Sequence, residues 1–71
     1  MENLHYEKIA TVTHIGSNLL IVGYNRRFQW AFRIVNKAGE IVREDAHYST
    51  AILAEQEGTI WIKHNLLISS E

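Results

Sequence analysis

The chain of 71 residues contains no cysteine and no proline, and each absence excludes a class of structure. Without cysteine it can form neither a disulfide nor a cysteine-based zinc site. Without proline no segment is marked as a linker, so we expect a single domain spanning residues 1–71. A domain of this size buries only about 60% of the surface of its unfolded chain. Its stability must therefore come from dense packing or from self-association.

Long hydrophobic runs are also absent. The longest one, LLIV at residues 19–22 followed by Gly23 and Tyr24, is far shorter than the roughly 20 residues that a membrane-spanning helix requires. The first residues, MENLHYEK, lack the basic start and the apolar core of a secretory signal. We therefore expect a cytoplasmic protein without membrane contact.

Neither sign of charge is in large excess, because the formal net charge is −1. This balance predicts no strong attraction to polyanions. The charges are unevenly distributed, however. Residues 24–43 hold five basic side chains against one acidic, whereas residues 44–57 hold four acidic side chains and no Lys or Arg. The folded chain either presents a basic and an acidic side or has an ordinary mixed surface, and the sequence leaves both open.

The first part of the chain has the pattern of two strands. Residues 8–15, KIATVTHI, alternate with period two and are rich in β-branched side chains, which is typical of a strand. Residues 16–18 predict a turn. Residues 19–22 predict a second strand that is apolar on both faces. Such a strand lies covered on both sides or at an interface.

A hairpin is the clearest local prediction. Residues 28–35 alternate, with one face formed by Phe28, Trp30, Phe32 and Ile34. The sequence NKAG follows at positions 36–39, with Asn first and Gly fourth, as in a type I turn followed by a left-handed glycine. We therefore expect residues 40–44 to pair antiparallel with the preceding strand.

Residues 48–58, YSTAILAEQEG, allow two interpretations. In the first, Ser49 or Thr50 caps a helix rich in good helix formers, and Gly58 forms a left-handed C-terminal cap. In the second, residues 48–54 are a strand and residues 55–58 are a turn.

A fifth, final strand is expected beyond this segment at residues 59–63 (TIWIK), and His64-Asn65 can turn the chain into a short tail strand at residues 66–69. The expected fold is therefore α+β, an antiparallel sheet of about five strands with one short helix packed on it. The alternative is an all-β small barrel, in which residues 48–54 are a strand.

Arginines and aromatic side chains are interleaved in residues 24–33, YNRRFQWAFR, as they often are in proteins that stack nucleic-acid bases. The segment WAF at residues 30–32 matches the end of the RNP1 pattern, but the basic residue and the glycine that should precede it are absent. Burying three rings of roughly 150–250 Å² each would supply much of the core of so small a domain. We therefore expect these rings to be core, with nucleic-acid binding through Arg26, Arg27 and Arg33 as the alternative.

The sequence shows no pattern of catalysis or of cofactor binding. Its four histidines have neither a helical i, i+4 pair nor metal-ligand spacing: His5, His14, His47 and His64. Its glycines are isolated, so no glycine-rich loop is available to hold a phosphate. A chain this short can hardly enclose a ligand pocket of about 300 Å³ or more. We expect no enzymatic activity, no cofactor and no metal.

Trp61 is the candidate contact residue. If residues 59–63 form a strand with Ile60 and Ile62 in the core, Trp61 points away from the core on the same side as Lys63. Tryptophan is enriched at binding hot spots, although an inverted strand would bury it instead. An outward Trp61 and the two-sided apolar strand at residues 19–22 leave more apolar surface than one core can cover. A homodimer is the simplest way to cover it.

Residues 39–55, GEIVREDAHYSTAILAE, resemble one repeat of the small bacterial YegP-like proteins. Such a repeat has a strand, a turn with Gly-Glu, a second strand ending in Tyr, then Ser or Thr and a helix carrying Ala-Glu. The matching positions are Gly39-Glu40, Tyr48, Ser49-Thr50 and Ala54-Glu55, and with the aromatic strand the likeness covers residues 28–58. The family is commonly a tandem of such units. The resemblance implies a helix in this segment and an assembly of two units, and it implies no activity.

The sequence thus predicts a small non-enzymatic interaction module, homodimeric, that binds a protein partner through a sheet edge or through the side that carries Trp61. The alternative is a nucleic-acid-binding module. The candidate partner-binding residues are Trp61, Lys63, Tyr24, Arg26, Arg27 and Arg33.

Overall fold

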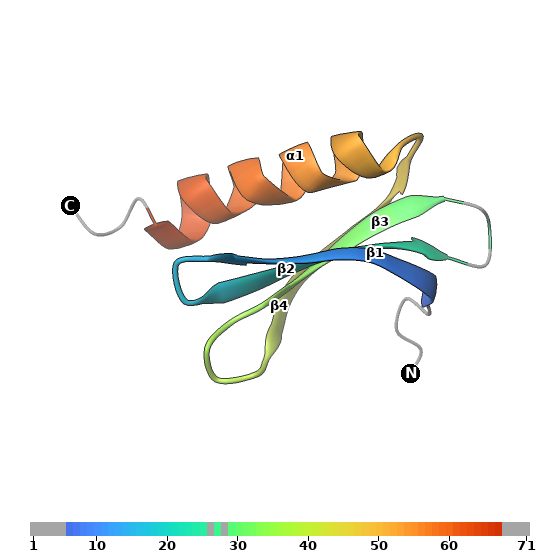
Figure 1. Ribbon diagram of the computed structural model, residues 1–71. Coiled ribbons are helices and arrows are strands. Elements are labelled where there is room, and N and C mark those ends of the chain that lie inside the picture. Colours follow the sequence, from blue (N-terminus) through green and yellow to red (C-terminus); the bar gives the residue numbers. More distant parts are fainter. Residues whose placement is uncertain (1–5, 26, 28, 68–71) are drawn as a thin grey trace.

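The computed structural model describes residues 6–25, 27 and 29–67, which form an antiparallel sheet with one helix across one of its faces (Figure 1). The elements are β1 (Tyr6–Ile15), β2 (Asn18–Asn25), β3 (Trp30–Val35), β4 (Ile41–Tyr48), the helix α1 (Ala51–Ile62) and a π-helical turn, η1 (Lys63–Leu67). The strands lie in the sheet in chain order, β1-β2-β3-β4. The predicted α+β class is confirmed, with four strands among the described residues in place of about five.

The hairpin between β3 and β4 forms as its turn residues predict. Gly39 has a φ of 88°, a conformation that residues with a Cβ rarely adopt. Its N–H donates to the Asn36 carbonyl at 2.9 Å. The side-chain oxygen of Asn36 accepts hydrogen bonds from the N–H groups of Ala38 and Glu40. This local network fixes the point at which the chain reverses.

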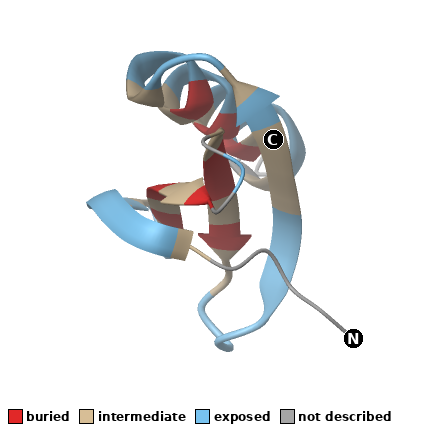
Figure 2. Ribbon diagram, turned by 90° about the vertical axis from the view of Figure 1, so that its right-hand side faces the viewer, coloured by how far each residue is buried: buried red, intermediate tan, exposed pale blue. Residues whose placement is uncertain are grey.

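The core lies between the sheet and α1 and is built on the two central strands. Alternate side chains of β2 and β3 point toward the helix and are at most 2% exposed: Leu20, Val22, Phe32 and Ile34. α1 contributes residues four apart along one side, Ala54, Gly58 and Ile62. Figure 2 shows the buried residues gathered in the central strands and in the helix, with exposed residues along the edge strands.

α1 begins after Thr50, one of its two predicted caps, and approaches the sheet closely. Thr50 Oγ1 accepts a hydrogen bond from the Leu53 N–H at 3.1 Å, which satisfies one of the free donors of the first turn. Gly58 is buried in the middle of the helix, so it is not a left-handed C-terminal cap. A Cβ at this position would lie 2.5 Å from Leu20 Cδ1 and 3.2 Å from Phe32 Cγ. The missing side chain therefore sets the distance between helix and sheet.

The predicted strand at residues 59–63 is wrong, because residues 59–62 are the last turn of α1 and Lys63 begins η1. Alternating Ile60 and Ile62 suit a strand locally. Ile62, however, lies four residues after Gly58, and this spacing buries it on the sheet-facing side of a helix. The tertiary packing of the small-residue side of α1 thus outweighs the β-propensity of this segment.

Two further expectations fail in the same region. The all-β barrel is wrong, because residues 51–54 are helical. The tail strand at residues 66–69 is wrong for residues 66 and 67, which belong to η1, while residues 68 and 69 lie outside the described part of the chain. Asn65 Nδ2 donates to the Trp61 carbonyl at 2.9 Å, a side-chain hydrogen bond across the junction of α1 and η1.

Candidate interaction surfaces

The candidate partner-binding residues do not form one surface. Arg33 alternates with the buried residues of β3, so it projects from the sheet face opposite α1, called here the open face. Tyr24 lies on the helix side of the sheet, with its ring centroid 4.9 Å from that of Trp30. Arg27 is exposed in the connection between β2 and β3. Arg26 lies outside the described residues.

Trp61 and Lys63 lie near the end of the helical segment. Lys63 is exposed, whereas Trp61 is half-buried and packs against the core. Trp61 therefore neither points away from the core, as an alternating strand would place it, nor lies wholly inside. The Arg43 guanidinium of β4 lies 5.9 Å from its ring centroid, so the indole connects the helix to the edge of the sheet.

The open face is largely apolar. Cross-strand pairing places two rows of side chains on it, Val12, Ile21, Arg33 and Glu44 in one, and His14, Leu19, Val35 and Ile41 in the next. Val12 is 54% exposed and Ile41 is 48% exposed, and Ile9 in the adjoining row is 55% exposed. No described element covers these side chains.

One ion pair lies within the open face. The Arg33 guanidinium donates to the Glu44 carboxylate and also lies 4.7 Å from the ring centroid of Tyr6. The Tyr6 ring occupies the space above Gly23, where a Cβ would collide with it. Burial of the Tyr6 hydroxyl, which has no hydrogen-bond partner among the described residues, raises its pKa to about 12 against the opposing effect of Arg33. Arg33 is thus engaged within the molecule.

Both edge strands are irregular. Register shifts between Tyr6 and Lys8 and between Ile9 and Thr11 insert extra residues into β1. The two shifts in the β3–β4 ladder likewise insert extra residues into β4, where His47 has a φ of 78°. Bulged edges are poor templates for pairing with another strand. This geometry disfavours a partner that adds a strand to the sheet.

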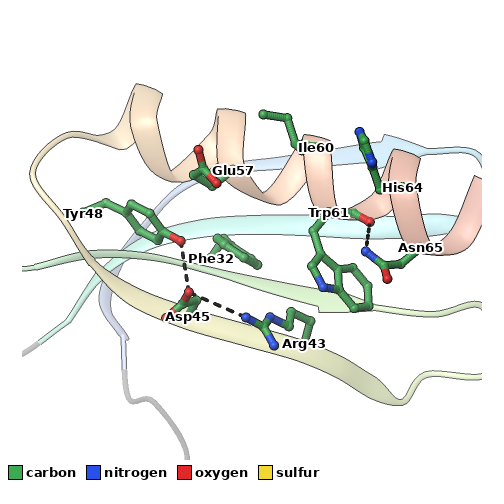
Figure 3. Close-up of a pocket in the computed structure, with 9 residues that line it drawn as sticks. All are labelled: Phe32, Arg43, Asp45, Tyr48, Glu57, Ile60, Trp61, His64 and Asn65. Carbon is green, nitrogen blue, oxygen red and sulfur yellow. Dashed lines mark hydrogen bonds and ion pairs between the residues drawn. The ribbon is translucent and has the colours of Figure 1, made fainter.

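A pocket of about 170 Å³ lies between α1 and β4, and we call it the α1–β4 groove (Figure 3). The helical segment supplies one wall, with Glu57, Ile60, Trp61, His64 and Asn65. β4 supplies the other wall, with Arg43, Asp45 and Tyr48, and Phe32 lies at the base.

Side-chain contacts hold the β4 wall of the groove in place. The Tyr48 hydroxyl donates to Asp45 Oδ2 at 3.1 Å, and Arg43 Nη2 lies 3.9 Å from the same oxygen. Asp45 Oδ1 accepts a hydrogen bond from the Ala46 N–H at 2.9 Å. Burial, and after it the hydrogen bond to Asp45, raise the pKa of Tyr48 to about 12. Tyr48 therefore remains a neutral donor at physiological pH.

The groove carries more negative than positive charge. Among the described residues that line it, Arg43 is the one Arg or Lys, against the carboxylates of Asp45 and Glu57. The Glu57 carboxylate makes no hydrogen bond or ion pair with any described residue. His64 stands at the other end of the groove, beside Trp61 (Figure 3). The end near Tyr48 is thus acidic.

The aromatic side chains of β3 pack largely as expected. Phe32 is 2% exposed, and Trp30 packs against the core while remaining half-buried. Trp30 pairs across the sheet with Tyr24 on one side and Tyr48 on the other. Phe28 lies outside the described residues. The described rings thus pack on one another and on the core.

The histidines are dispersed. His14 is on β1, His47 on β4 contacts Gln29 at 3.0 Å, and His64 lines the groove, whereas His5 lies outside the described residues. Within the described part of the chain, no three His, Asp or Glu side chains are grouped so that they could hold a metal ion. No helix in the described ranges combines the length and hydrophobicity needed to cross a membrane.

Comparisons with known proteins give no match, because no family model, no curated protein and no solved structure is significantly similar to this chain. The resemblance of residues 28–58 to a YegP-like repeat therefore stays a prediction.

The sequence prediction included Trp61 but missed the other residues of the groove. Glu57, Ile60, Trp61 and His64 follow the i, i+3, i+4, i+7 spacing of one helix side, and this pattern was available in the sequence. It was hidden by the expectation of a strand at residues 59–63. That this side of the helix faces Arg43 and Asp45 is a result of tertiary packing, and no local sequence pattern predicts it.

Proposed function

We propose that this protein is a small, non-enzymatic, cytoplasmic interaction module that forms a homodimer and binds a protein partner. The observation that carries the proposal is the apolar open face, where Ile9, Val12 and Ile41 are each about half exposed. Contiguous apolar surface on a soluble protein marks a site of association. A domain of this size also gains from burying more surface than its own core provides.

A second copy of the chain suits the open face. The bulges of β1 and β4 oppose association at the sheet edges and favour association through the face. The resemblance to a family that is commonly a tandem of such units also supports an assembly of two.

The dimer is tested by measuring the mass in solution over a concentration series. The wild-type chain should have twice the mass of one chain, and Val12→Lys should be monomeric because it places a charge in the apolar interface. Ile52→Lys is the matched control, since Ile52 is 66% exposed on α1, away from the open face. A monomeric wild type, or a Val12→Lys variant that dimerises as well as Ile52→Lys, would show that the dimer proposal is wrong.

The α1–β4 groove supports the partner-binding part of the proposal. It combines Trp61 and Tyr48 with charged groups, and Trp, Tyr and Arg are the residues most enriched at binding hot spots. A partner that binds here should lose affinity when Trp61 is replaced by Ala. The exposed Lys63, which does not line the groove, gives the comparison variant Lys63→Ala.

Nucleic-acid binding through Arg26, Arg27 and Arg33 is the rival proposal. The contacts of Arg33 with Glu44 and Tyr6 do not favour it, because a phosphate would have to compete with them. A titration with mixed-sequence DNA and RNA oligonucleotides at two salt concentrations distinguishes the two. Phosphate binding weakens steeply with salt, by roughly one counterion per neutralised phosphate. The absence of binding at low salt would reject the rival.

A further inference from the structure

The α1–β4 groove has the size of a site for one side chain. Its volume of about 170 Å³ is below the roughly 300–1,000 Å³ of pockets that hold drug-sized ligands. The groove also lies beside the edge strand β4, where another molecule can reach it. A long side chain projecting from the surface of a partner suits this volume better than a metabolite does.

Aromatic rings line the groove along its length. Tyr48 stands at one end and Trp61 at the other, with Phe32 between them (Figure 3). The rings of Phe32 and Tyr48 stack with centroids 5.9 Å apart. The face of an aromatic ring attracts a cation that lies within about 6 Å of it. Arg43 already lies over Trp61, so the Tyr48 end is the one left for an incoming cation.

Carboxylates from both walls lie at this same end. Glu57 extends from α1 and Asp45 from β4, on the two sides of Tyr48 and Phe32 (Figure 3). Arg43 is 3.9 Å from Asp45, beyond hydrogen-bond distance, so it neutralises that carboxylate only in part. Burial contributes most to the raised pKa of Tyr48, and the negative charges of Asp45 and Glu57 add to it. Both carboxylates are therefore close enough to Tyr48 to make this end of the groove electrostatically negative.

We propose that the α1–β4 groove binds the side chain of a lysine or arginine presented by the partner protein. The cationic group lies between Glu57 and Asp45, and the methylene stem lies along the ring of Tyr48. The inference rests on the partner-binding role proposed above and specifies which kind of side chain the partner inserts. An acidic side chain would meet two carboxylates, and an uncharged one would desolvate Glu57 without pairing it. A cation can lie against the aromatic ring and pair with the carboxylates at the same time.

The test is an NMR titration of the full chain with blocked glycine–serine peptides that differ only in their central residue. The lysine and arginine peptides should shift the Trp61 indole N–H and the amide signals of the groove. A single charge-assisted contact should give a dissociation constant of about 1–10 mM. Peptides with norleucine or glutamate at the centre should give no saturable shift, because norleucine lacks the charge and glutamate reverses it.

Two variants test the role of Glu57. Glu57→Gln keeps the shape of the side chain and should weaken binding of the lysine peptide roughly three- to tenfold. Glu55→Gln removes the same charge from the same helix outside the groove and should bind as the wild type does. Well-dispersed amide spectra show that both variants are folded. Equal binding of the lysine and norleucine peptides, equal affinities of wild type and Glu57→Gln, or no shift with any peptide would overturn the inference.

The solution mass of the same samples separates this inference from the dimer proposal. A dimer that does not bind the lysine peptide overturns the groove site alone. A monomer that binds it overturns the dimer alone and leaves the groove site supported.

Discussion

Two tyrosines show how strongly single residues of this small protein depend on their immediate surroundings. The ring of Tyr6 lies above Gly23 on the open face, and the ring of Tyr48 stacks on Phe32 in the α1–β4 groove. Neither residue is fully buried, yet burial raises the pKa of each to about 12. Their hydroxyls therefore keep their protons at pH values where an unfolded tyrosine loses them.

These shifts predict that the protein loses stability in alkaline solution. An unfolded tyrosine ionises near pH 10, so between about pH 10 and 12 the unfolded state releases protons that the folded state still holds. The free energy of unfolding must then fall as pH rises through this interval. Tyr48→Phe and Tyr6→Phe should each reduce the fall, because phenylalanine cannot ionise. Urea unfolding at a series of pH values measures it.

Comparison with the wild type at each pH isolates the tyrosines from lysines, which also titrate in this range. Variants that lose stability between pH 10 and 12 as steeply as the wild type would contradict the assignment. Circular dichroism at pH 9 is the control that each variant is folded before the titration begins.

Single residues were also where the sequence was most informative. Gly39 could be placed in advance, and the helix cap could be narrowed to Ser49 or Thr50, because a left-handed turn and a helix cap are satisfied by backbone groups only a few residues away. The bulge at His47 could not be foreseen, since a φ of 78° in a residue with a side chain is imposed by strand pairing.

At the scale of elements, the contact of α1 with the sheet is the central feature. Ala54, Gly58 and Ile62 form the buried side of the helix and lie over β2 and β3. Two of these residues are small, so the helix backbone comes close to Leu20 and Phe32. The contribution of this contact to stability can be measured by a substitution at Gly58, where helix and sheet are closest.

The substitution Gly58→Ala has two opposing effects on the free energy of unfolding, and the size of each is known. Alanine is favoured over glycine within a helix by about 1 kcal/mol, whereas inserting a methyl group into a packed core costs typically about 1–3 kcal/mol. The new Cβ would lie 2.5 Å from the fully buried Leu20, so we expect the steric cost to be larger. The free energy of unfolding should fall by about 1 kcal/mol in a urea titration.

The control for this substitution is Gln56→Ala, at an exposed position of the same helix. Its effect should stay within about 0.5 kcal/mol. A Gly58→Ala variant that is more stable than the wild type would mean that the sheet yields easily at Leu20.

The elements also differ in how far their formation depends on short-range sequence features. The existence of the four strands was predictable, because alternation and turn residues are short-range features, and the capping hydroxyls offered the helix as one of two interpretations of residues 48–58. The end of α1 was not, since residues 59–63 contain β-branched side chains that favour a strand when considered alone. The open face and the groove depend on which elements pack together, so the sequence anticipated only Trp61 in the groove and, on the open face, Arg33 and the second apolar side of residues 19–22.

At the scale of the whole molecule, the uneven charge of the sequence does not separate into a basic side and an acidic side among the described residues of β3 and β4. Arg33 from the basic segment pairs with Glu44 from the acidic one on the open face. Arg43 lies next to Asp45 in the groove. The two segments meet because β3 and β4 are joined by a tight turn. The surface is therefore mixed, with Glu57 left as an unneutralised charge among the described residues.

The chain-order sheet has a consequence for how the molecule acquires its structure. Each strand pairs with the one before it, so only short loops must close, and such topologies fold fast. α1 is different, because it follows β4 in the chain but rests mainly on β2 and β3, so we expect its docking to require those strands to be paired already. Docking of the helix should then be a late event. In stopped-flow experiments, Gly58→Ala should accelerate unfolding and leave the refolding rate nearly unchanged. If the whole loss of stability appeared instead as slower refolding, the helix would already be docked in the folding transition state.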